Sequence, residues 1–224
     1  PADATAEARA VAAVFGAGAR LLAGAQATAE RLATTAPGGG VLHLAAPVFL
    51  DDASFSVSGG VTLSLPQAQS YRVTSGNRSW EAKGAGSLLE LPQLTLLQAG
   101  KDSTAFNLRA LEGGRIHLPL AGPVTSGAMH LLAEGANSRI DLPQLRQLEG
   151  YAGWGTYTDL TVRQGGQIHL PLLQSMATAL LQFNTNSFLS TTSIGQLTNC
   201  TLAIDGLAID FSSVTNLGGS TVLL

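Results

Sequence analysis

The sequence predicts an all-β solenoid of about eight stacked rungs, with an α-helical cap on its N-terminal side. A phrase of alternating apolar and polar residues recurs every 20 to 28 residues from position 38 onward, and such a repeat is typical of stacked structural units. Each copy alternates with the period of two that a strand with one buried face requires. The preceding segment has a helical pattern instead, so we divide the chain into a cap at 1–37 and a solenoid at 38–224.

The predicted cap is rich in Ala, and its apolar side chains recur at the spacing of one helix face. The apolar positions are Val11, Val14, Phe15, Leu21, Leu22 and Leu32. The run from Pro37 to Gly40 (PGGG) ends this helix, because Pro and Gly both interrupt helical structure. A helix packed against the first rung would cover the apolar surface that a bare solenoid end exposes.

The clearest copies of the repeat run from Gly113 to Pro119 (GGRIHLP) and from Gly165 to Pro171 (GGQIHLP). With the proline position as the anchor, the copies lie at 45, 66, 92, 119, 143, 171, 192 and 212. The residue three before the anchor is apolar in every copy: Leu42, Leu63, Leu89, Ile116, Ile140, Ile168, Leu189 and Ile209. The next residue is polar in every copy: His43, Ser64, Glu90, His117, Asp141, His169, Ser190 and Asp210.

Each repeat therefore contains a strand, a Gly-rich turn, a second strand, a corner, a short apolar segment and a loop. The second strand is the phrase described above, and the first is an alternating run before the turn, such as Trp80 to Ala82 or Leu160 to Val162. Proline directly after a strand fits a corner, where its missing N–H leaves no ladder hydrogen bond unmade. One such unit cannot bury its own apolar face, so successive units are expected to stack.

In the length of its turns and in its variable loops, this repeat resembles the parallel β-helices of pectin-lyase-like enzymes and of bacterial adhesin and autotransporter passenger shafts. The resemblance covers about residues 38–224, and it concerns architecture, since the phrase around Gly113 is not a functional motif of either group. It implies a right-handed parallel β-helix. The clustered Asp calcium ligands of the pectate-lyase type are not visible in this chain.

The composition excludes several classes of protein. Charged residues make up 12% of the chain, about half the usual globular share, so the chain is not of the highly charged, disordered type. Its net charge of −3 argues against a nucleic-acid partner. No apolar run approaches the ~18 residues of a membrane span, so no membrane insertion is expected. Cys200 is the only cysteine, which excludes a disulfide framework, and we expect neither metal nor cofactor.

The polar column of the repeat is the first place to look for chemistry. On adjacent rungs it brings Glu90, His117, Asp141 and His169 into one ladder. We interpret this ladder primarily as a surface row of neighbours with opposite charge. An alternative is a polysaccharide-active enzyme, a lyase or glycoside hydrolase, that uses Glu90 and Asp141. These residues lie two rungs apart, about 9.6 Å at the backbone, near the upper limit for an inverting pair.

The loops are the second place, because insertions leave the repeat at one position and should gather on one side of the rod. The longest repeat contains the stretch 150–157 (GYAGWGTY), which holds Tyr151, Trp154 and Tyr157. Aromatic rings with polar tips suit stacking against sugars or contact with a protein. We therefore predict that these three residues bind a ligand, although a loop folded back over the solenoid would explain them equally well.

These observations favour a non-catalytic shaft or adhesin module of a secreted or cell-surface protein over the enzyme. The expected partner is a polysaccharide or a cell-surface protein. The final residues, 218–224 (GGSTVLL), read as the start of another repeat without a polar covering segment. We therefore expect the solenoid to continue beyond residue 224, or this end to associate with a second copy of the chain, because an uncovered strand edge is a template for pairing.

Overall fold

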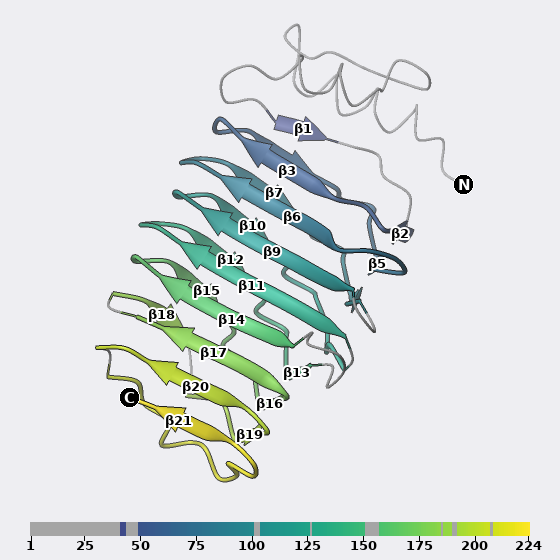
Figure 1. Cartoon of the computed structure of the whole chain (residues 1–224). Helices are drawn as coiled ribbons and strands as arrows, with labels where there is room; N and C mark the ends of the chain where they lie inside the picture. The colour runs from purple at the N-terminus through teal and green to yellow at the C-terminus, as the bar shows by residue number, and fades with distance from the viewer. Residues whose placement is uncertain are drawn as a thin grey trace, which may run out of the picture.

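The computed structural model describes residues 41–43, 49–100, 104–125, 127–150, 157–184, 186–189, 192–206 and 208–224. In this part the chain forms a parallel β-solenoid of about six turns (Figure 1). The predicted cap at 1–37 lies outside the described residues, and the described residues contain no helix. The all-β class and the repeat architecture predicted from the sequence are thus confirmed.

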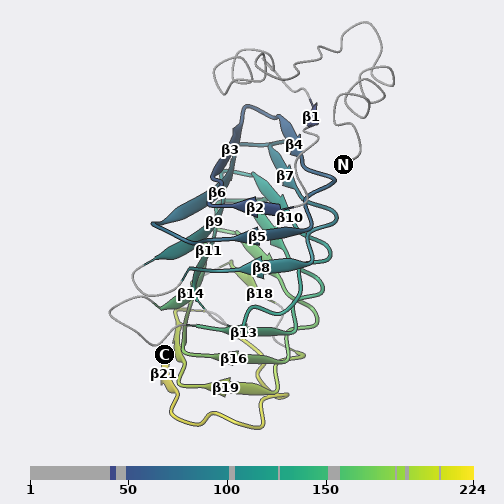
Figure 2. The ribbon, with the colours of Figure 1, turned by 90° about the vertical axis from the view of Figure 1, so that its right-hand side faces the viewer.

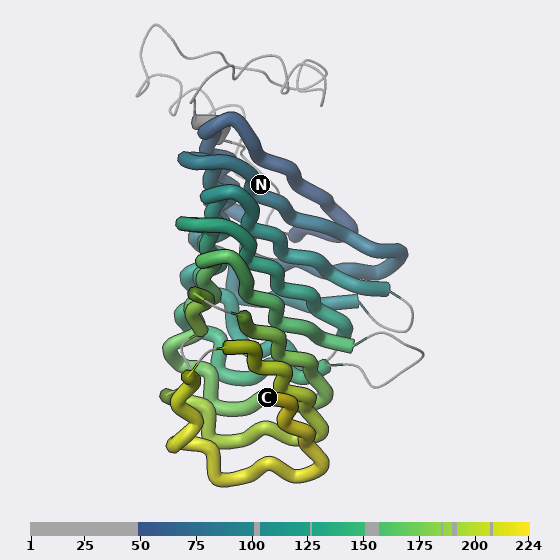
Figure 3. Tube along the Cα trace, turned by 60° about the vertical axis from the view of Figure 1, so that its left-hand side comes forward, coloured from purple at the N-terminus to yellow at the C-terminus, as the bar shows by residue number. Residues whose placement is uncertain are grey.

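Three faces of stacked strands surround the core of the solenoid. Figure 3 shows the successive turns of the chain from the side. The wide sheet is formed by β3 (Phe55–Ser58), β6 (Arg78–Lys83), β9 (Ala105–Leu111), β11 (Ala128–Glu134), β14 (Thr158–Arg163), β17 (Ala179–Phe183), β20 (Thr201–Ile204) and β21 (Thr221–Leu223). The narrow sheet is formed by β1 (Val41–His43), β4 (Thr62–Ser64), β7 (Leu88–Glu90), β10 (Arg115–His117), β12 (Arg139–Asp141), β15 (Gln167–His169) and β18 (Phe188–Leu189).

The third face consists of two smaller sheets, which Figure 2 shows from outside. One contains β2 (Phe49–Asp51), β5 (Ser70–Arg72) and β8 (Leu96–Gln98), and the other contains β13 (Gln147–Glu149), β16 (Ser175–Ala177) and β19 (Gln196–Thr198). All strand pairs are parallel, because each rung returns to the same face before the next strand is added.

The register of the narrow sheet is the one that the sequence columns predict. Ile116 pairs with Leu89 on one side and with Ile140 on the other, and the same column continues to Ile168 and Leu189. These side chains are buried because alternate residues of a strand point to opposite faces of the sheet. The polar column of Glu90, His117, Asp141 and His169 therefore lies on the outer face, one residue per rung.

The count of eight rungs is wrong, and the structure has about six turns. At the C-terminal end, Ile209 and Asp210 keep the alternation of the repeat but form no strand, so the narrow sheet ends at β18. At the other end, β1 and β2 of the first copy pair with β4 and β5, and residues 44–48 between them lie outside the described part. At the C-terminal end, the alternating pattern thus extends further along the chain than the strand pairing of the narrow sheet.

An aromatic cluster fills the core of the N-terminal turns. The ring centroids of Tyr71 and Trp80 are 4.4 Å apart, and Phe106 lies 4.8 Å from Tyr71. Both polar tips are satisfied, because the Tyr71 hydroxyl and the Trp80 indole N–H donate to the Ala53 carbonyl at 2.7 and 3.0 Å. Burial, with a smaller contribution from the Asp52 carboxylate, raises the pKa of the Tyr71 phenol above its usual range.

Two kinds of turn join the wide sheet to the narrow sheet, and the sequence distinguishes them. In turns with a Gly-Gly pair, the second glycine lies against the rung before it. A Cβ at Gly114 would lie 2.1 Å from the Ala82 carbonyl oxygen, and one at Gly166 would lie 2.2 Å from that of Ala133. These glycines are therefore required by the close approach of neighbouring backbones.

The other kind of turn is one residue longer and ends in a buried serine. Ser138 accepts a hydrogen bond from the Gly113 N–H of the preceding rung at 2.8 Å, and it donates to the Glu134 carbonyl at 2.6 Å. Ser87 makes the equivalent pair of bonds to the Gly60 N–H and the Lys83 carbonyl. Ser87 and Ser138 thus each satisfy an N–H of the glycine turn in the preceding rung.

Candidate binding site

The site begins where the longest loop rejoins the wide sheet. Tyr157 directly precedes β14, and its side chain is 46% exposed. Tyr151 and Trp154, which the sequence predicts as its partners in ligand binding, lie outside the described residues. Of the three predicted aromatic residues, the structure therefore places only Tyr157, at the outer surface of the wide sheet.

Two polar residues on neighbouring strands lie beside Tyr157. In the pairing of β11 with β14, His130 lies opposite Asp159, and both side chains point outward because Leu131 and Leu160 of the same strands face the core. His130 Nδ1 contacts Asp159 Oδ2. The Tyr157 ring meets the imidazole edge-on, with centroids 6.0 Å apart and an interplanar angle of 81°. We call Tyr157, His130 and Asp159 the platform.

The platform combines the three properties that a polar ligand with an apolar face requires. Tyr157 offers an exposed ring, His130 keeps Nε2 for a ligand because Nδ1 is engaged by Asp159, and Oδ1 of Asp159 accepts hydrogen bonds. The described contacts of His130 are the one with Asp159 and the edge-on contact with the Tyr157 ring.

Sequence reasoning identified Tyr157 but missed His130 and Asp159. His130 lies outside the repeated columns, and the connection that leads to its strand is shorter than those of the two neighbouring rungs. The signal that could have found the pair is the alternation of Leu131 and Ala133 in β11, which matches that of Leu160 and Val162 in β14. Aligning these two runs brings the histidine opposite the aspartate.

The second predicted location, the polar column on the narrow sheet, is organised as an ion cluster. Asp141 is 8% exposed, and its Oδ1 accepts from Arg139 Nε at 2.7 Å and Nη2 at 2.6 Å. His169 Nδ1 lies 3.2 Å from the same oxygen. Glu90 lies two rungs away, with His117 between them in the register. The Asp141 carboxylate is therefore in contact with Arg139 and His169. The contact with His169 is of the kind that a surface row of oppositely charged neighbours would contain.

Other reactive groups add no chemistry to these locations. Cys200 is buried, and burial raises the pKa of its thiol, which keeps it protonated and unreactive near neutral pH. Among the residues described, no group of three or more His, Cys, Asp and Glu side chains is arranged to hold a metal ion. Nor does this part of the chain contain a helix of the length and apolarity needed to cross a membrane.

Comparison of the chain with models of protein families, with curated proteins and with solved structures found no match. The class to which the chain belongs, a parallel β-solenoid, therefore rests on its own strand pairing. The resemblance to pectin-lyase-like enzymes and to adhesin shafts stays a prediction from the repeat.

Proposed function

We propose that this chain is a non-catalytic module of a secreted or cell-surface protein, in which the solenoid is a shaft and the platform binds a glycan. The observation that carries the proposal is the half-exposed Tyr157 ring set against the His130–Asp159 pair on the outer face of the wide sheet. The right hand of the β-helix and the participation of Tyr151 and Trp154 belong to the same proposal.

Glycans fit the platform for reasons of complementarity. A sugar ring has an apolar face of C–H groups that stacks on an aromatic ring, and its hydroxyls both donate and accept hydrogen bonds. His130 and Asp159 provide groups of both kinds beside Tyr157. The rigid sheet holds these groups in place before the ligand arrives, which lowers the entropy lost on binding.

The proposal is tested with an array of immobilised glycans, followed by calorimetric titration of the best ligand. We expect Tyr157→Ala to weaken binding about tenfold, which corresponds to ~1.4 kcal/mol. His130→Ala should weaken it as well. Phe188→Ala is the matched control, because Phe188 is a similarly exposed aromatic residue, 52% accessible, on the narrow sheet.

Two outcomes would contradict the proposal. If no glycan binds the array, or if Tyr157→Ala binds as tightly as the unchanged chain, the platform is not a glycan site. If a cell-surface protein binds instead and Tyr157→Ala abolishes that contact, the surface is a protein interface. The proposed location is checked separately, by labelling intact and permeabilised cells of the source with an antibody against the solenoid.

A further inference from the structure

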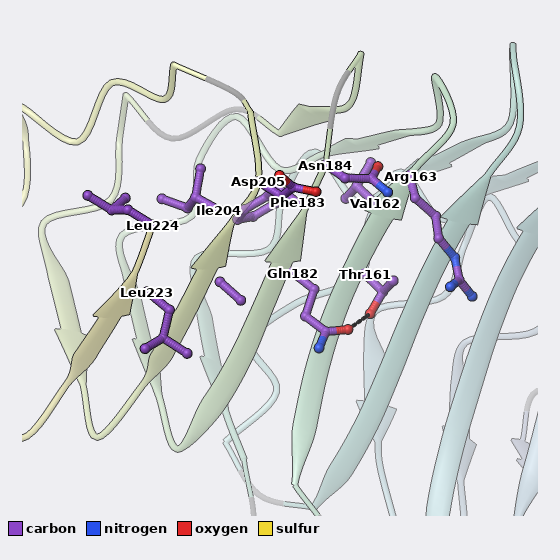
Figure 4. A pocket seen from close by; sticks show the side chains of 11 residues that line it. Thr161, Val162, Arg163, Gln182, Phe183, Asn184, Ile204, Asp205, Leu223 and Leu224 are labelled. Atoms are coloured by element: carbon purple, nitrogen blue, oxygen red, sulfur yellow. Dashed lines mark hydrogen bonds between the residues drawn. The ribbon is translucent and has the colours of Figure 1, made fainter.

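A hollow of about 440 Å³ lies in the outer surface near the C-terminal end of the solenoid. It crosses four neighbouring strands of the wide sheet, β14, β17, β20 and β21, close to their carboxyl ends (Figure 4). Ala203 is the smallest residue of its lining and lies between Gln182 and Leu223 in the same outward column. Nothing in the function proposed above uses this hollow.

The lining of the hollow is polar on one side and apolar on the other. Gln182 and Asp205 provide an amide and a carboxylate, and Leu223 and Leu224 form an exposed apolar edge. Arg163 also borders the hollow, but its Nε lies 3.1 Å from Oε2 of Glu134, so its charge is already paired. A ligand would therefore meet hydrogen-bonding groups and an apolar wall without an unpaired guanidinium.

The hollow and the platform are joined by one side chain. Thr161 lies two residues after Asp159 on β14, on the same outward face and about 7 Å along the strand. Its hydroxyl lies 3.4 Å from Asp159 Oδ1 and 3.3 Å from Gln182 Oε1. A hydroxyl has a single proton, so it serves one of these acceptors at a time and leaves the other open to a ligand.

We infer that the platform and the hollow are two parts of one site that binds a neutral, linear glycan. The inference rests on the proposed function and extends it to the ligand's length, direction and charge. The chain of sugars begins at Tyr157, passes over Thr161 and ends in the hollow above Ala203. It therefore crosses the strands obliquely, from β14 toward β21, on the outer face of the wide sheet.

The charge of the ligand follows from the charges along this path. Asp159 and Asp205 are the carboxylates that line it. His130 contacts Asp159, and the Arg163 guanidinium beside the path is paired with Glu134. A uronate chain would bring further negative charges toward these carboxylates and would be repelled. Hydroxyl-rich neutral sugars meet donors and acceptors without that cost.

The test measures affinity against ligand length. The probes are linear β-linked gluco- and xylo-oligosaccharides from the disaccharide to the octasaccharide, with galacturonate oligomers of the same lengths as the acidic series. We expect the octasaccharide to bind the unchanged chain at least about tenfold more tightly than the disaccharide, because only the longer ligand reaches the hollow. The neutral series should bind more tightly than the acidic series.

Ala203→Tyr fills the hollow and should remove the gain with length while the disaccharide affinity remains. Ser56→Tyr is the matched control, because Ser56 is an exposed residue at the other end of the same outward column, and it should keep the gain. Gln182→Ala tests the same part of the site without adding volume, and it should reduce the octasaccharide affinity alone. Circular dichroism identifies any variant that does not fold.

The outcomes separate this inference from the proposed function. If disaccharides bind and Tyr157→Ala abolishes their binding, but both Ala203→Tyr and Gln182→Ala keep the full gain with length, the platform stands and the extended site is wrong. Tighter binding of galacturonate oligomers would overturn the inferred ligand class. If neither series binds at any length, the proposed function fails and the extended site fails with it.

Discussion

Buried serines connect neighbouring turns of the solenoid by hydrogen bonds. Ser138 is completely buried, and it connects the Gly113 N–H of one rung to the Glu134 carbonyl of the next. Because no water reaches these groups, the serine hydroxyl is the acceptor on which the Gly113 N–H depends. The Ser138 side chain thereby adds a link between two rungs whose backbones also pair on either side of it.

Replacing Ser138 with alanine should lower the free energy of unfolding by about 1–3 kcal/mol, the usual cost of leaving a buried donor without a partner. The Glu134 carbonyl still accepts from the Glu112 N–H at 3.0 Å, so the loss arises mainly at Gly113. Urea denaturation measures the change. Ser56→Ala, at an exposed position of β3, is the control and should stay within about 0.5 kcal/mol of the unchanged chain. Equal stability of the two variants would contradict this role of Ser138.

Asp52 makes the stability of the fold depend on pH in the acidic range. Hydrogen bonds from the Thr74 hydroxyl and from the Thr74 and Ser75 N–H groups hold the pKa of this carboxyl well below its usual range. A carboxyl with a lowered folded pKa contributes stability that is fully present above its unfolded pKa, about 3.9. That contribution is lost as the pH falls through the lower, folded value.

We therefore expect the difference in stability between the unchanged chain and Asp52→Asn to be constant near neutral pH and to shrink below about pH 4. Asparagine is the matched replacement because residue 52 has a φ of 52°, a conformation that asparagine tolerates. Thermal melts of both proteins across this pH range measure the difference. A difference that stays constant down to pH 2 would show that the Asp52 hydrogen bonds do not contribute.

At the scale of the elements, the Gly-Gly turns allow the backbones of successive rungs to approach closely. Gly166→Ala should destabilise the fold by about 1–3 kcal/mol, because the new methyl group would force the neighbouring Ala133 carbonyl to move. Gly195→Ala is the control, since its Cβ would meet only the Gln174 carbonyl oxygen at an ordinary 3.8 Å. Urea denaturation of both variants compares them. If Gly166→Ala were as stable as Gly195→Ala, the contact would not limit the stacking.

The narrow sheet could be predicted almost residue by residue, whereas the site could not. Columns such as Leu89, Ile116 and Ile140 repeat an aliphatic residue in one register, so their pairing can be predicted from the sequence. The outward positions of the wide sheet repeat no residue type, and variable loops separate them. The contact of His130 with Asp159 depends on that hidden register.

The predicted number of rungs was wrong for a different physical reason. Alternation shows which side chains can face a core, but a rung also needs a neighbour that pairs with its backbone. Ile209 has the right pattern and no such pairing, so its copy of the repeat does not complete a turn. The same lack of information about strand pairing limits prediction of the binding surface. Tyr157 could be identified as an aromatic residue in a glycine-rich loop, but the residues beside it on the neighbouring strand could not.

At the scale of the whole molecule, the last rung that the structure describes has exposed apolar side chains. Val222 follows the buried Leu202 in the innermost column of the wide sheet, yet it is 47% exposed, and Leu217 and Leu223 are about as exposed. Burying an apolar side chain of this size contributes roughly 1.5–3 kcal/mol. We therefore propose that the 224-residue chain associates end to end through β21.

The association predicts concentration-dependent mass in light scattering and analytical ultracentrifugation. Val222→Lys should shift the chain toward the monomer, because a charge on the last core position opposes both apolar contact and edge pairing. Gln174→Lys, which adds the same charge at an exposed position on the third face, should leave the association unchanged. A chain that is monomeric at all concentrations would contradict the proposal.

The parallel stacking of rungs also decides how the molecule would respond to tension. Hydrogen bonds between neighbouring strands lie roughly along the long axis, so a pull on the last rung loads one strand's bonds at a time. Each rung of 20 to 28 residues would then release on the order of 80 Å of extended chain before the next yields. A shaft held at its N-terminal turns and pulled at the last rung would lengthen in steps and dissipate force. The aromatic cluster of Tyr71, Trp80 and Phe106, which lies in those N-terminal turns, would be among the last parts to unfold.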